Sequence, residues 1–76
     1  MRNVYITVYE DEYKAYTTMD KARAAAKARL EEIRSCCSEK DETSIVEFKN
    51  ETSLRIVKDD GRLVFLTVQV RKLAVE

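Results

Sequence analysis

The sequence predicts an α+β fold of two layers, in which one helix packs on an antiparallel sheet of four or five strands. One segment repeats its apolar residues at helical spacing, and the other segments alternate residue types as half-buried strands do. Asp59-Asp60-Gly61 separates two of these strands, and glycine supplies the positive φ of a tight hairpin. The expected element order is β-β-α-β-β-β in a single domain, residues 1–76.

The first strand is expected from Asn3 to Tyr9, where β-branched residues alternate with tyrosine and threonine. We expect Val4, Ile6 and Val8 to face the helix. The acidic run Glu10 to Glu12 should end this strand, and Tyr13 to Thr17 should return beside it. Because the turn between them lacks glycine, the alternative order β-α-β-β-β stays open.

The helix is expected from Met19 to Cys37, with the hydroxyl of Thr17 or Thr18 capping its first turn. Asp20 lies in that turn, where a carboxylate suits the helix dipole. Small alanines in the first half should let the helix approach the sheet closely. The expected apolar stripe is Met19, Ala22, Ala26, Leu30, Ile33 and Cys37.

Three strands should follow the helix, over Ser44 to Lys49, Ser53 to Lys58 and Arg62 to about Val75. Alternation along these strands predicts which side chains face the helix. The expected inward residues are Val46, Phe48, Leu54, Ile56, Val64, Leu66, Val68 and Val70.

A single helix covers only one face of such a sheet, so the other face should be bare. That face would carry Tyr5, Tyr9, Val57, Leu63 and Phe65. Small proteins rarely expose so large an apolar area unless it binds something. The acidic first loop lies at the end of the same strand. The predicted partner-binding residues are Tyr5, Tyr9, Glu10, Asp11, Glu12, Tyr13, Leu63 and Phe65.

Four interpretations of the outward aromatic residues stay open. They are ordinary exposed side chains sheltered by Lys and Arg stems, the interface of a homodimer, the docking surface for another protein, or a stacking platform for single-stranded bases on Tyr5 and Phe65. The 14 basic and 14 acidic residues cancel, which argues against a dedicated nucleic-acid binder. The candidate phosphate contacts of that last interpretation are Arg23, Lys27 and Arg34.

Catalysis is not expected, because the chain has no histidine and its single glycine excludes a glycine-rich phosphate loop. Adjacent Cys36 and Cys37 suit neither a structural disulfide nor a closed zinc site, so we expect reduced thiols, with Cys37 packed. Glu10 to Glu12 could bind a divalent ion, but a hydrated loop is the expected state. We expect no metal, no cofactor, no membrane span and a cytoplasmic location.

The stretches TTMDKARAAAKA and VKDDGRLVFLTV, in a chain that opens directly on a strand, resemble small α+β proteins encoded by phages and mobile elements, including those of the anti-CRISPR type. The resemblance covers the whole chain as a pattern, without a diagnostic motif. It implies a non-catalytic inhibitor that occupies the surface of a host protein or complex. The neutral charge departs from the strongly acidic members and argues against DNA mimicry.

Overall fold

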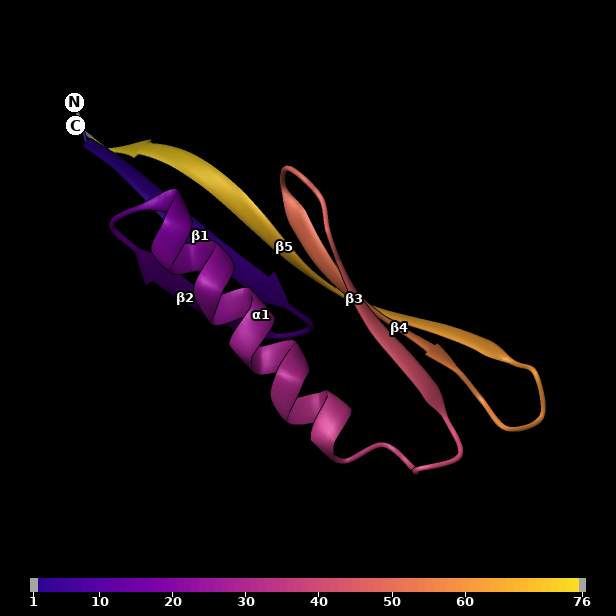
Figure 1. Ribbon diagram of the computed structural model, residues 1–76. Helices are drawn as coiled ribbons and strands as arrows, with labels where there is room; N and C mark the ends of the chain where they lie inside the picture. Colours follow the sequence, from indigo (N-terminus) through magenta and orange to yellow (C-terminus); the bar gives the residue numbers. More distant parts are fainter. Residues whose placement is uncertain (1, 76) are drawn as a thin grey trace.

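The structure is a computed structural model that describes residues 2–75, and in it one α-helix packs on one face of a five-stranded antiparallel sheet (Figure 1). The predicted two layers and the order β-β-α-β-β-β are confirmed, including the second strand. The elements are β1 (Arg2–Tyr9), β2 (Glu12–Tyr16), α1 (Met19–Ser35), β3 (Glu42–Glu47), β4 (Glu51–Val57) and β5 (Leu63–Val75).

Strand β5 is the central strand of the sheet, whose order is β2-β1-β5-β4-β3. Its first half, Leu63–Gln69, pairs with β4, and its second half, Gln69–Val75, pairs with β1 on the other side. The two hairpins are therefore offset along β5, as Figure 1 shows. This offset makes the molecule long and narrow, with extents of 50 × 20 × 17 Å.

The two ends of α1 follow local capping rules. Thr18 is extended, and its Oγ1 accepts a hydrogen bond from the amide of Lys21 at 3.1 Å, which confirms one of the two predicted caps. The helix ends at Ser35, two residues before the predicted end. The Cys36 amide bonds back to the carbonyls of Ile33 and Arg34, which closes the last turn.

The core lies between the apolar stripe of α1 and the facing side of β4 and β5. Ala22, Ala26 and Leu30 are buried on the helix, and Ile33 and Cys37 pack at the edge of the core. The inward positions predicted for β4 and β5 are confirmed. Those that are fully enclosed by the helix and the neighbouring strands are Leu54, Ile56, Val68 and Val70.

The prediction for β1 was wrong by one residue, so its two faces are exchanged. Thr7 is buried beneath α1 and Tyr9 packs against the core, whereas Val4, Ile6 and Val8 point away from the helix. Both sides of β1 are apolar enough to be buried, so alternation alone could not choose between them. Tyr9 lies beside Ala25 and Ala26 of α1, whose small side chains leave room for its ring.

The prediction for β3 was wrong for the same reason. Ile45 lies opposite Leu54 and packs against the core, while Val46 is exposed on the other face. Phe48 lies beyond the end of β3, in the turn to β4, and is 53% exposed. Ile45 and Val46 are adjacent and both apolar, so a shift of one residue leaves the alternation of the strand equally plausible.

The β1–β2 turn contains the one positive φ of a non-glycine residue among residues 2–75, 52° at Glu10. A residue other than glycine pays a conformational cost of roughly 1–2 kcal/mol in this left-handed region. We therefore expect Glu10→Gly to raise the free energy of unfolding by about 0.5–1 kcal/mol and the melting temperature by about 2–8 °C. Thermal unfolding followed by circular dichroism measures this. Asp11→Gly is the control, since Asp11 has a negative φ and gains nothing; an equal rise in both variants would contradict the assignment.

Candidate binding face

The face of the sheet opposite α1, called the open face here, carries apolar side chains from all five strands. They form two lobes on either side of its middle. The first lobe, over β2, β1 and the end of β5, consists of Val4, Ile6, Val8, Tyr13 and Leu73. The second lobe, over the start of β5 with β4 and β3, consists of Val46, Val57, Leu63 and Phe65.

The exposed large hydrophobic residues of the described chain gather on this face. Six such residues occur among residues 3–74, and five of them point from the open face, while the sixth, Phe48, lies in the adjoining turn. Phe65 is 55% exposed and Tyr13 is 67% exposed. An apolar surface concentrated on one side of a small domain is typical of a protein-binding site.

A polar pair lies between the two lobes. Ser53 and Thr67 are neighbours on β4 and β5, and their hydroxyl oxygens share a hydrogen bond of 2.9 Å. Ser53 is only 4% exposed although no helix covers it. One of the two hydroxyls donates to the other, so this hydrogen bond can persist when an apolar surface covers the middle of the open face.

The charged side chains described on the open face are balanced. Glu42 and Glu51 carry negative charge, and Arg55 and Arg71 carry positive charge. Arg71 donates a hydrogen bond to the side-chain oxygen of Gln69 at 3.0 Å. The face therefore offers no field of one sign to attract a strongly charged partner such as nucleic acid.

The structure separates the predicted partner-binding residues into three groups. Leu63 and Phe65 lie on the open face, as expected, and Tyr13, for which no face was predicted, lies there too. Glu10 and Asp11 lie in the exposed β1–β2 turn. The placement of Tyr5 and Tyr9 on the uncovered face was wrong, because both share the helix side of β1 with the buried Thr7. Glu12 also lies on the helix side.

Arg29 explains why Tyr9 and Glu12 belong to the helix side. Its guanidinium lies 5.6 Å from the centre of the Tyr9 ring and 3.3 Å from a carboxylate oxygen of Glu12. The hydrogen bond and charge of Glu12, assisted by Glu32, raise the pKa of Arg29, so this side chain stays cationic. Arg29 thus links the β1–β2 hairpin to α1, and Glu12 is already paired with a residue of its own chain.

The predicted binding face did not include Val4, Ile6, Val8, Val46 and Leu73. Leu73 could have been found, because it continues the period of two from Leu63 and Phe65 along β5. The other four belong to β1 and β3, whose faces were assigned in reverse. Their apolar character was visible in the sequence, but their direction depends on the shape of the helix surface.

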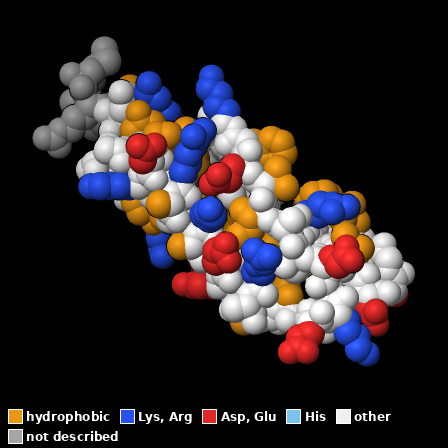
Figure 2. Space-filling view, in the orientation of Figure 1, with side chains coloured by type: hydrophobic (Ala, Val, Ile, Leu, Met, Phe, Trp, Pro, Cys, Tyr) orange, Lys and Arg blue, Asp and Glu red, His pale blue; other side chains and the backbone are white. Residues whose placement is uncertain are grey.

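The candidate phosphate contacts on α1 do not form a free basic site. Arg23 donates to the Lys49 carbonyl at 2.6 Å, and Arg34 donates to the Thr43 hydroxyl at 2.8 Å. Lys27 is exposed. Figure 2, which looks onto α1, shows acidic side chains interspersed with the basic ones over this surface. Two of the three cations are therefore already bound to their own chain.

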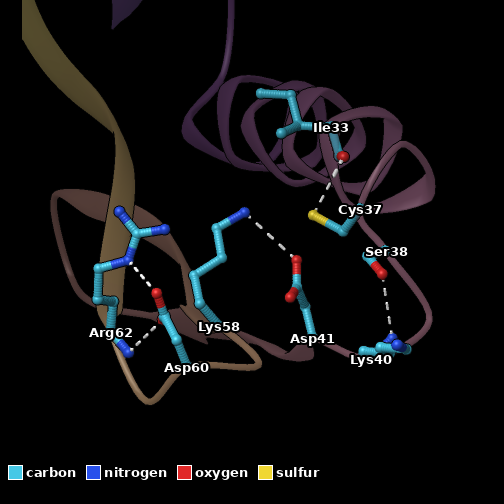
Figure 3. Close-up of polar contacts among 8 residues, drawn as sticks. All are labelled: Ile33, Cys37, Ser38, Lys40, Asp41, Lys58, Asp60 and Arg62. Carbon is cyan, nitrogen blue, oxygen red and sulfur yellow. Dashed lines mark hydrogen bonds and ion pairs between the residues drawn. The ribbon is translucent and has the colours of Figure 1, made fainter.

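Figure 3 shows the polar contacts around Cys37 at the end of α1 and in the loops beside it. Cys37 donates from its thiol to the Ile33 carbonyl at 3.6 Å, and both cysteines are free. The nearly buried carboxylate of Asp41 is paired with Lys58 at 3.3 Å. Within residues 2–75 no group of three or more potential metal ligands occurs, and no helix is long and apolar enough to cross a bilayer.

Comparison with protein-family models, with curated proteins and with solved structures found no match.

Proposed function

We propose that the chain is a non-catalytic protein-binding module that acts through its open face. The observation that carries the proposal is the gathering of Tyr13, Val46, Leu63, Phe65 and Leu73 on the side of the sheet that α1 leaves bare. Exposed aromatic and aliphatic side chains with charged residues around them are the usual composition of protein interfaces. Binding would work by occupying a surface and needs no reacting group.

A finer version of this proposal is a phage-encoded inhibitor of the anti-CRISPR type, which would block a host protein or complex. It is supported by the resemblance of the helix and the last hairpin to small phage α+β proteins. The balanced charges of the open face agree with a protein target and not with DNA mimicry. Its specific test is the survival of a CRISPR-targeted phage in cells that express the chain; loss of that protection in Phe65→Lys would support it, and no protection by the wild type would contradict it.

The double substitution Tyr13→Ala with Phe65→Ala tests the binding face. Both side chains are more than half exposed, so the fold should lose little stability. We expect partner binding to weaken at least tenfold, because aromatic anchors supply much of the energy of an interface. Immobilised wild type and variant are compared by capture from a host lysate with quantitative mass spectrometry, followed by titration of the retained protein.

Ala24→Lys is the matched control, since Ala24 is exposed on the far side of α1. It should retain the same proteins as the wild type. If the folded double variant binds a partner as tightly as the wild type does, the open face is not the binding surface.

A further inference from the structure

The chain exposes more surface than a compact monomer of its mass. Its accessible surface is 5582 Å², whereas monomeric proteins of 8.8 kDa expose about 4,800 Å². Its radius of gyration is 13.9 Å, against about 11.4 Å for a compact domain of this length. The excess of about 800 Å² equals the area that one partner contributes to a standard protein interface.

The shape of the molecule explains where this excess lies. The offset of the two hairpins along β5 makes a long sheet, and α1 covers only one of its faces. Leu30, Leu54, Val68 and Thr52 are the largest fully buried side chains of the described residues, so the present core is small. A second layer over the open face would remove the excess and enlarge the core.

The open face is suited to a copy of itself. Both lobes are apolar, so a two-fold axis that brings the first lobe of one copy over the second lobe of the other sets apolar area against apolar area. Glu51 and Arg55 lie on either side of Ser53 on β4. A two-fold axis that lies between the two sheets and passes over Ser53, close to perpendicular to β4, brings Arg55 of each copy near Glu51 of the other.

Building on the proposed function, we infer that the partner of the open face is a second copy of this chain. Two sheets pack face to face about 10 Å apart, with their strands inclined by about 30°, and the two α1 helices lie on the outside. The Ser53–Thr67 pairs meet in the middle, and Phe65 of each copy is buried by the other. A host protein that uses the same face competes with this second copy.

Sedimentation equilibrium of the full chain tests the inference. From about 1 µM to 1 mM, the wild type should approach twice the 8.8 kDa chain mass and dissociate on dilution. Phe65→Lys should weaken the dimer at least about 100-fold, because each interface holds two copies of the new charge. Ala24→Lys should dimerise as the wild type does. The charge reversals Glu51→Arg and Arg55→Glu should each weaken the dimer, and combining them should restore it.

Several results would overturn the inference. A wild type that is monomeric at 1 mM has no second copy on its open face. A dimer that survives Phe65→Lys unchanged uses another surface, such as a strand edge. If the variant that combines Glu51→Arg with Arg55→Glu does not regain the dimer, the two-fold axis over Ser53 is wrong. If the wild type is a monomer and captures a host protein that the double variant Tyr13→Ala with Phe65→Ala no longer binds, the dimer is wrong but the proposed function stands. If the wild type is a monomer and the double variant captures the same protein equally well, both proposals are wrong.

Discussion

Leu54→Ala is expected to lower the free energy of unfolding by about 2–5 kcal/mol. Leu54 is fully buried on β4, opposite Leu66 on one side and Ile45 on the other. Truncation removes apolar contacts and leaves a cavity that the surrounding strands cannot close. A domain of this length has a total stability of only about 4–11 kcal/mol, so the variant should be near its unfolding threshold at 37 °C.

Urea unfolding at low micromolar concentration measures this loss without a contribution from self-association. Leu73→Ala is the matched control, because Leu73 is 49% exposed on the open face. We expect it to cost less than about 1 kcal/mol. Equal losses at the two leucines would mean that the helix does not define the covered face.

Ala26→Leu is expected to destabilise the chain by about 1–3 kcal/mol or more. Ala26 is 1% exposed and lies where α1 meets the sheet, beside Thr7 and Val68. A larger side chain should push the helix away from β1 and β5. This would also increase the exposed area of the Tyr9 ring. The same push would disturb the contact between Arg29 and the Tyr9 ring, which holds the first hairpin to the helix.

Ala24→Leu provides an internal control for the same chemical change. Ala24 is exposed two residues earlier in α1, and leucine is a good helix former, so its stability should change by no more than about 0.5 kcal/mol. Thermal unfolding of the two variants separates packing from helix propensity. A loss of equal size in both would show that the alanine stripe does not set the distance between helix and sheet.

The elements of this fold were predictable because their signals are local. Helical spacing, the Thr18 cap and the glycine hairpin each act within a few residues, and Gly61 adopts the expected positive φ of 88°. The inward faces of β4 and β5 were also predictable, since Leu54 and Ile56 alternate with the polar Ser53 and the charged Arg55. There only one face of the strand suits burial.

The faces of β1 and β3 were not predictable, because the deciding contacts come from another element. On β1, hydrophobicity favours Val8 for the core, yet the low alanine surface of α1 leaves space that the ring of Tyr9 fills and Arg29 covers. On β3, Ile45 and Val46 differ by one methylene group. Their direction is set by the pairing with β4, which the sequence of β3 does not contain.

An uncovered apolar face is present although the faces of β1 and β3 were assigned in reverse. Exchanging the sides of β1 removes Tyr5 and Tyr9 from the open face but adds Ile6 and Val8 in their place. The single helix, and not the exact strand register, is what leaves one side of the sheet uncovered. The expectation of a binding surface therefore depended on the count of helices, which was the more secure part of the prediction.

The most direct test of the open face is the accessibility of individual methyl groups in the wild-type chain, measured by NMR with a soluble paramagnetic agent. In a dilute sample the methyl signals of Leu63 and Leu73 should be strongly broadened, while those of Leu30 and Leu54 stay sharp. When the concentration rises, Leu63 and Leu73 should become protected as a partner copy covers them. Methyl groups of Leu63 and Leu73 that are already protected in a dilute monomer would contradict the account.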